Sequence, residues 1–224
     1  MKVINLYRLI LLFVYTLLVA CTQHKIEQES VSIAPSQAKT YVYECPAGYD
    51  FVVSIEDDQA WLFLAGKTIQ LPRVPSASGE KYSDKQTTFW SKGDESRLEL
   101  GTQKHIACKN NHAKAIWEHA KLKGVDFRAL GNEPGWTLEL VGDDTIIFSH
   151  FYDKINKYVF IRSAPEVDQV ARKAVYKAKN EEHELSVTIS GTPCQDSMSG
   201  ESFESSVTVR LDGKLFNGCG KTLH

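Results

Sequence analysis

The sequence lacks the patterns that most metal-binding and nucleic-acid-binding proteins carry. It has no C-x-x-C pair, and its seven histidines are scattered, with none in H-x-x-x-H spacing. It has no basic tract either, and its formal net charge at pH 7 is −2. Paired ligand spacings and basic patches are the usual signs of metal sites and of nucleic-acid binding. We therefore expect no metal, no cofactor and no nucleic-acid partner.

Motifs of nucleophilic enzymes are also missing. No G-x-S-x-G nucleophile elbow occurs. The segment 78–81 reads Ser-Gly-Glu-Lys and matches S-x-x-K, but no S-D-N or K-T-G motif follows it. The S-x-x-K motif lies on a helix, whereas Gly79 and the surrounding turn residues favour a loop. We expect no catalytic residue and interpret the chain as a protein that is not an enzyme.

A short apolar run near the N-terminus indicates export. Lys2 and Arg8 form a basic start, and an almost unbroken apolar run follows from Leu9 to Ala20. This order is typical of a signal peptide, and the run is too short to span a bilayer permanently. Leu-Val-Ala before Cys21 resembles the lipobox of bacterial lipoproteins. That resemblance implies cleavage before Cys21 and a thiol that carries a diacylglycerol, with palmitate among its acyl chains. An ordinary signal peptide with a chance cysteine is the alternative.

Export also determines which chemistry the remaining cysteines can undergo. Outside the cytoplasm disulfides can form, and four cysteines follow Cys21. Three pairings are possible. Sequence order favours Cys45–Cys108 and Cys194–Cys219, because a boundary falls between the two pairs. The residue after the lipidated cysteine is Thr22 and not Asp. By analogy with lipoprotein sorting, this is compatible with the outer membrane of a Gram-negative cell, with the protein facing the periplasm.

Composition and turn spacing divide the chain into segments and predict a mainly β protein. After the signal peptide (1–20), residues 21–40 comprise the lipidated cysteine and a polar, flexible tether that reaches about 25 Å. Short β-prone runs separated by turn residues predict a small antiparallel β-barrel domain over 41–109. Apolar residues at helical spacing predict a linker helix over 110–124. A second antiparallel β domain, of unknown function, is expected over 125–224.

Two details of this division have alternatives. Ala113, Ile116, Trp117 and Ala120 form the apolar stripe of the linker helix, and we expect the Trp117 face to pack on a neighbouring domain rather than to bind a partner. The segment 170–179 has alanines at helical spacing but also Val and Tyr between flanking strands, so we favour a strand. Asp212-Gly213 predicts a hairpin turn.

One segment of the predicted barrel resembles a known family. It matches S-G-x-x-Y, seven residues, then W-x-K-G-x-x-A-x-L, the signature of the membrane-bound family of inhibitors of c-type lysozyme. The matching residues are Ser78, Gly79, Tyr82, Trp90, Lys92, Gly93 and Leu98. Ser96 stands where the family usually has Ala, a small-for-small change expected inside a strand. Cys45 and Cys108 bracket the segment and fit the disulfide of that family.

The resemblance implies c-type lysozyme as the partner and a β-barrel that inserts a Ser/Lys-bearing loop region into the lysozyme cleft. It assigns Ser78 and Lys92 to the lysozyme active site, and we include Gly79 and Tyr82 in the predicted lysozyme-binding set. Gly79 would let the loop approach closely. Tyr82 and Trp90 are expected to hold the loops in shape.

The second β domain carries a pattern of its own. Gly-Asn-Glu-Pro-Gly-Trp over 131–136 and Cys-Gln-Asp-Ser-Met-Ser-Gly over 194–200 resemble a family of uncharacterised bacterial envelope lipoprotein domains. The resemblance brings no activity with it. We favour turn chemistry around a disulfide. The rival functions are a hydrolase that uses Asp196 or Ser199, and a binding module for glycan or an envelope protein anchored by Trp136 or Tyr152.

Overall fold

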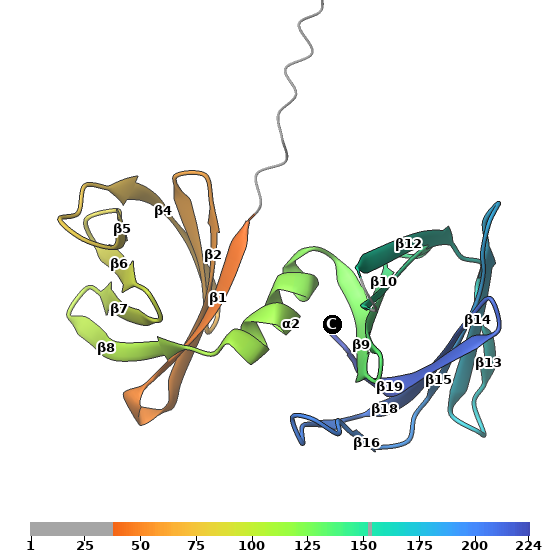
Figure 1. Ribbon diagram of the computed structural model, residues 1–224. Coiled ribbons are helices and arrows are strands. Elements are labelled where there is room, and N and C mark those ends of the chain that lie inside the picture. The colour runs from red at the N-terminus through yellow and green to blue at the C-terminus, as the bar shows by residue number, and fades with distance from the viewer. Residues whose placement is uncertain (1–37, 152–153) are drawn as a thin grey trace, which may run out of the picture. The chain divides into compact units, whose positions relative to one another are not determined.

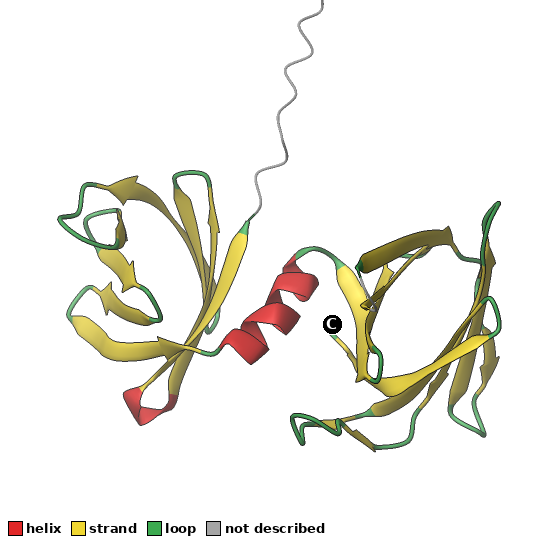
Figure 2. Cartoon of the chain, viewed as in Figure 1, coloured by secondary structure: helices red, strands yellow, loops and turns green. Residues whose placement is uncertain are grey.

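The computed structural model describes residues 38–151 and 154–224 (Figure 1). Antiparallel strands dominate the described residues, and helical turns occur only in a short 3-10 segment and one α-helix (Figure 2). The mainly β fold class is thereby confirmed. The predicted signal peptide, the lipidation site Cys21, the tether up to Gln37, and Tyr152 lie outside the described residues.

The first eight strands form a closed barrel in which neighbours along the chain are neighbours in space (Figure 1). The first strand, β1, closes the barrel because it pairs with both β2 and β8, with Tyr43 opposite Phe51 on one side and Asn110 on the other. The strands are β1 (Lys39–Cys45), β2 (Tyr49–Glu56), β3 (Gln59–Leu64), β4 (Lys67–Val74), β5 (Glu80–Ser83), β6 (Thr87–Lys92), β7 (Glu95–Leu100) and β8 (Gln103–Asn110), with the 3-10 helix η1 (Pro46–Gly48) between the first two.

The barrel interior follows from the alternation of side chains along each strand. Residues two apart point to the same face, and in β2 Phe51, Val53 and Ile55 are buried while their neighbours are less so. The inward residues of all eight strands meet in one apolar core. Its fully buried members are Tyr43, Val53, Ala60, Leu62, Leu71, Tyr82, Phe89, Leu98 and Cys108. The disulfide Cys45–Cys108 joins β1 to β8 and covalently fixes the closure.

A single α-helix, α2 (His112–Leu122), follows the barrel in the described chain. It begins at Asn111, whose side chain caps the helix by accepting a hydrogen bond from the Lys114 N–H. It ends before Gly124, which has a positive φ of 78°. The helix predicted over 110–124 is therefore present.

The Trp117 face of α2 is buried, as expected, but the predicted apolar stripe is only partly correct. Trp117 packs against Phe203 with ring centroids 5.3 Å apart, and the Lys221 ammonium lies 4.5 Å from its ring centre. Ile116 and Ala113, by contrast, are exposed, and Ala115 is buried instead. The large indole determines which face of the helix is covered, and Ile116 lies to one side of that face.

The remaining strands form a nine-stranded antiparallel sheet in the order β12-β11-β10-β9-β19-β18-β15-β14-β13. Its first and last strands along the chain, β9 and β19, are neighbours in space (Figure 1). The segment 170–179 contains a strand, and Asp212-Gly213 forms the predicted hairpin turn. The strands are β9 (Val125–Asn132), β10 (Gly135–Val141), β11 (Thr145–Phe151), β12 (Ile155–Ile161), β13 (Glu166–Asp168), β14 (Lys173–Lys179), β15 (Glu184–Ser190), β18 (Ser205–Leu211) and β19 (Lys214–Thr222).

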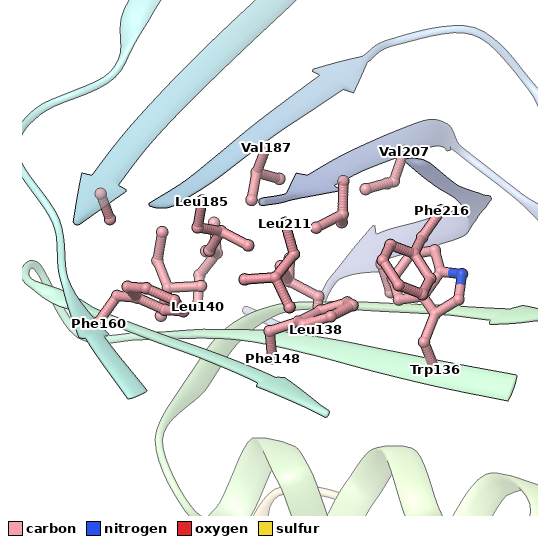
Figure 3. Close-up of a cluster of buried hydrophobic side chains, with 14 of the residues drawn as sticks. Trp136, Leu138, Leu140, Phe148, Phe160, Leu185, Val187, Val207, Leu211 and Phe216 are labelled. Atoms are coloured by element: carbon pink, nitrogen blue, oxygen red, sulfur yellow. The ribbon is translucent and has the colours of Figure 1, made fainter. Parts of the chain in front are cut away.

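Aromatic and branched side chains fill the core of this second sheet (Figure 3). Phe148 lies at its centre, with ring centroids 5.9 Å from Trp136 and 5.1 Å from Phe216. A two-stranded hairpin of β16 (Cys194–Gln195) and β17 (Ser202–Phe203) is attached by the disulfide Cys194–Cys219. The structure thus contains the disulfide pairing that sequence order favours.

Candidate functional site

The candidate site is formed by two connections at one end of the hairpin of β5 and β6. Ser78 lies in the connection that precedes β5, and Lys92 is the last residue of β6. Glu80 pairs with Ser91 in the ladder between these strands. Because antiparallel pairing brings the start of one strand next to the end of the other, the two residues meet at the same end of the barrel although 14 positions separate them.

Gly79 allows the two connections to approach this closely. Its φ is +69°, and a Cβ atom placed on it would lie 2.2 Å from the Ser91 carbonyl oxygen and 3.2 Å from the Lys92 Cβ. Any side chain at this position would clash with the backbone of β6. The glycine therefore has a steric role, which is to bring the backbone beside Ser78 against the strand that carries Lys92.

The Ser78 and Lys92 side chains are available to a partner. Both are exposed, and within residues 38–151 and 154–224 no hydrogen bond uses the Ser78 hydroxyl and no ion pair uses the Lys92 ammonium. The Ser78 backbone, by contrast, is held firmly: its carbonyl oxygen accepts hydrogen bonds from the Trp90 indole N–H at 2.9 Å and from the Ser76 hydroxyl at 2.7 Å. An unpaired hydroxyl on an anchored loop and an unpaired ammonium at the end of β6 thus lie at the same end of the β5–β6 hairpin.

Tyr82 does not take part in this exposed surface. Its side chain is 0% exposed and stacks on Phe89, with ring centroids 6.2 Å apart. Burial raises the pKa of the Tyr82 phenol and also that of the neighbouring Tyr43. Both phenols are therefore neutral at physiological pH. Direct contact between Tyr82 and a lysozyme is incompatible with this structure, and its inclusion in the predicted binding set is corrected: Tyr82 supports the strands from inside the barrel.

A small polar cavity of about 360 Å³ lies beside the loop. Its walls include Arg73, Ser76, Gly79 and Lys81. Arg73 forms ion pairs with Asp58 at 3.6 Å and with Glu80 at 3.2 Å, so its charge is already balanced. Lys81, also in the cavity wall, forms no ion pair among the described residues, so Lys81 and Lys92 are both unpaired positive charges at this end of the barrel.

Ser96, the one departure from the family signature, lies on β7 opposite Ser91 and Cys108. Its side chain is 3% exposed, and its hydroxyl has no hydrogen-bond partner among the described residues. The substitution is inside a strand, as expected. It leaves a buried hydroxyl without a hydrogen-bond partner on the strand opposite Cys108.

In the second β sheet, the two motif stretches meet each other. The Asn132 amide donates a hydrogen bond to Asp196 at 2.5 Å across 64 positions of sequence. Asp196 also accepts from the backbone N–H and the hydroxyl of Ser199, both at 2.7 Å, and from the Met198 N–H. The Ser199 backbone N–H, aided by these other donors, lowers the pKa of Asp196, so the carboxylate stays ionised and fully engaged.

The same motifs also shape the core. Trp136 is 1% exposed, and its indole N–H donates to the Asn217 carbonyl at 3.3 Å. A Cβ atom on Gly218 would lie 2.0 Å from the Leu130 carbonyl oxygen and 2.7 Å from the Trp136 ring. The motif residues therefore pack and hydrogen-bond with one another, which agrees with turn chemistry around a disulfide.

These contacts bear on the rival functions of the second sheet. The Ser199 hydroxyl donates to Asp196, and no histidine contact completes a nucleophile–base pair there in the described chain. Trp136 is buried and cannot be an exposed anchor for a glycan, so that expectation is wrong. Tyr152 lies outside the described residues. Sequence reasoning missed the exposed Met198 at the tip of the 196–200 turn, and it also missed Ser76, whose position two residues before Ser78 is typical of a serine turn.

The residues that the structure describes contain no group of three or more His, Cys, Asp or Glu side chains arranged to hold a metal ion. Their helical segments do not reach the length and apolarity needed to cross a bilayer.

Comparison with known proteins identifies the barrel. Residues 43–107 match the family model described as "Membrane-bound lysozyme-inhibitor of c-type lysozyme". This part of the chain is therefore similar to that family. A membrane-bound lysozyme inhibitor of C-type lysozyme from Yersinia enterocolitica is 40% identical over 70 residues, which are 30% of this chain and 59% of the relative. The chain thus spans less than two thirds of that relative. No solved structure matches the chain.

The family match confirms the resemblance that the signature predicts. It includes the whole signature from Ser78 to Leu98 and seven of the eight barrel strands in full or in large part. The description of the family names inhibition of c-type lysozyme, and the match is confined to the barrel.

Proposed function

We propose that this protein inhibits a c-type lysozyme by placing Ser78 and Lys92 in the active-site cleft of that enzyme. One observation carries the proposal: Ser78 and Lys92 of the signature are exposed and without partners among the described residues, at the same end of the β5–β6 hairpin, and the Ser78 backbone is anchored. In the signature segment 78–98, the buried side-chain polar atoms without a hydrogen-bond partner are the hydroxyls of Ser96 and Tyr82.

The chemistry of the target explains the choice of residues. A c-type lysozyme cleaves its glycan with two carboxyl groups, one protonated and one ionised. The Lys92 ammonium offers a positive charge and three donors to the ionised carboxyl. The Ser78 hydroxyl can donate to one carboxyl or accept from the protonated one. A hydroxyl and an ammonium held side by side therefore complement both states of the pair.

We further propose that the protein acts from the bacterial envelope. The lipobox-like segment before Cys21 would attach the chain to a membrane, which we take to be the outer membrane of a Gram-negative cell. A polar tether of 17 residues, from Thr22 to Ala38 before β1, would then keep the barrel within about 23 Å of the lipid. Lysozyme attacks peptidoglycan in the same compartment. The described second sheet provides no assembled catalytic group, so we propose a non-catalytic role for the whole chain.

A mutational series on the unlipidated fragment Thr22–His224 tests the proposal. Lys92→Ala should weaken lysozyme binding by about 2–5 kcal/mol, because it removes one partner of a charge pair that becomes buried in the complex. Ser78→Ala should cost about 1.5–3 kcal/mol, which is the range for a hydrogen bond to a charged group. The double variant should lose less than the sum, because both side chains serve neighbouring carboxyls. The measurement is the dissociation constant at one salt concentration.

Lys81→Ala is the matched control. Lys81 belongs to the same barrel end and carries the same charge, but it lies outside the signature, on β5 opposite Trp90. Its removal should change the dissociation constant little. Equal losses for Lys81→Ala and Lys92→Ala would show that general charge attraction explains binding, and the insertion of a Ser/Lys pair would be refuted.

A further inference from the structure

The backbone of the loop that carries Ser78 is held by two side-chain hydrogen bonds. The Ser78 carbonyl oxygen accepts hydrogen bonds from the Trp90 indole N–H at 2.9 Å and from the Ser76 hydroxyl at 2.7 Å. A carbonyl oxygen has two lone pairs, and both are used here. We infer that Trp90 and Ser76 form a clamp on Ser78 that holds the loop in its lysozyme-binding conformation before lysozyme arrives. This inference rests on the proposed function.

The loop needs such a clamp because little else holds it. Residues 75–79 are all exposed, so apolar packing contributes little to their order. Trp90 is placed to reach them from β6, where it pairs with Lys81 on one side and Arg97 on the other. On the C-terminal side of Ser78, the ladder pairing of Glu80 with Ser91 fixes the chain at the start of β5. The backbone is thus held at Ser78 and at Glu80, while the Ser78 hydroxyl stays free.

Order in the unbound state has a direct consequence for affinity. A loop that must be ordered on binding loses part of the interaction free energy to its own conformational entropy. A loop already held in the bound conformation avoids that loss. Trp90 and Ser76 are therefore positioning residues: they act on lysozyme binding through Ser78 and need not touch the enzyme.

The test compares three variants in the unlipidated fragment Thr22–His224. Trp90→Phe keeps an aromatic ring and deletes the donor, and Ser76→Ala deletes the second donor on an exposed loop where packing is not at stake. Each should raise the dissociation constant for a c-type lysozyme about fivefold, the equivalent of one ordinary hydrogen bond. Trp61→Phe on β3 is the matched control, because Trp61 is an exposed indole of the same barrel that makes no hydrogen bond to the 75–79 loop in the described structure. It should leave the constant within about twofold.

Two readouts separate positioning from general stability. The first is a double-mutant cycle: in the Trp90→Phe background, Ser78→Ala should cost clearly less than in the wild type, because a misplaced hydroxyl contributes less. Lys92→Ala should cost nearly the same in both backgrounds. The second is amide hydrogen exchange in the free protein, where Trp90→Phe and Ser76→Ala should speed exchange over residues 76–79 and leave the strands protected.

The outcomes distinguish the clamp from the proposed function. Wild-type affinity in both Trp90→Phe and Ser76→Ala, or unchanged exchange over 76–79, would overturn the clamp. If Trp90→Phe does not fold, Ser76→Ala decides alone. If the wild-type fragment fails to bind any c-type lysozyme, the proposed function falls, and the exchange measurement still decides whether the two donors order the loop.

Discussion

The barrel and the second sheet each bring a sequence motif together, but they use the polar residues of that motif in opposite ways. At the end of the barrel, Ser78 and Lys92 are adjacent, exposed and without partners in the described structure. In the second sheet, Asn132, Asp196 and Ser199 bond to one another. The comparison teaches that a recognisable motif is not by itself a site. The hydrogen bonds that its polar groups already make determine whether they can bind anything else.

The same contrast extends to the aromatic residues of the motifs. Trp90 uses its indole N–H to anchor an exposed loop, whereas Trp136 is buried in a core and bonds to the Asn217 carbonyl. One tryptophan organises a surface and the other organises an interior. Variants that disturb each region should therefore separate binding from stability.

The largest expected effect comes from removing the disulfides one at a time. Replacing Cys45 and Cys108 by Ala should lower the free energy of unfolding by about 4 kcal/mol, and replacing Cys194 and Cys219 by about 3.5 kcal/mol, from loop-closure entropy at separations of 63 and 25 residues. Urea unfolding measures both values. Only the first pair should reduce lysozyme binding, because only that bridge closes the barrel. An equal loss of lysozyme binding after replacement of Cys194 and Cys219 would contradict the assignment of binding to the barrel.

A smaller effect should follow from Asp196→Ala. It removes the acceptor for Ser199, Met198 and Asn132 and leaves donors without partners, so the free energy of unfolding should fall by about 2 kcal/mol. The lysozyme dissociation constant should not change. A loss of lysozyme affinity at constant stability would mean that the second sheet belongs to the binding site.

The acid sensitivity of the protein sharpens this prediction. Because the pKa of Asp196 is lowered in the folded state, its contribution to stability is present above the unfolded pKa of about 3.9 and is lost as the pH falls through the lower, folded value. The stability difference between the wild type and Asp196→Asn should therefore shrink as the pH falls below about 4. Unfolding curves for both proteins between about pH 6 and about pH 2 provide the measurement. A constant difference over this range would contradict the assigned hydrogen bonds.

The smallest effect, and the only stabilising one, is expected from Ser96→Ala. The change restores the residue usual in the family and removes a buried hydroxyl without a partner, so the free energy of unfolding should rise by about 1 kcal/mol. Lysozyme affinity should stay constant, because Ser96 is inside the barrel. Ser91→Ala on the neighbouring strand is the control, because the Ser91 side chain bonds with Tyr43 and its loss should destabilise.

Most of the fold could be predicted from local signals in the sequence. Turn residues and alternation indicated that both regions are β, apolar residues at helical spacing indicated the helix, and sequence order favoured the observed disulfides. The 14-residue spacing of Ser78 and Lys92 was compatible with two adjacent loops, and antiparallel pairing of Glu80 with Ser91 produces that arrangement.

The rest depends on contacts between distant parts of the chain. Periodicity alone does not show that β9 lies beside β19 or that Asn132 reaches Asp196. The expected exposure of three side chains was also wrong. Trp136 and Tyr82 are buried in the cores of the two β regions, and Ile116 is exposed on the helix. Apolar spacing identifies an element, but the partner that covers it is selected by tertiary structure.

The pairing of β9 with β19 has a consequence for the order in which the protein is made. Synthesis proceeds from the N-terminus, and all eight barrel strands are available once Asn110 has emerged. β9 emerges soon afterwards but lacks one neighbour until the last strand of the chain follows, and the Leu223 N–H bonds to the Asp126 carbonyl at 2.8 Å only at the very end. Until β19 is present, β9 therefore has an unpaired strand edge, the kind of surface that can pair with another chain.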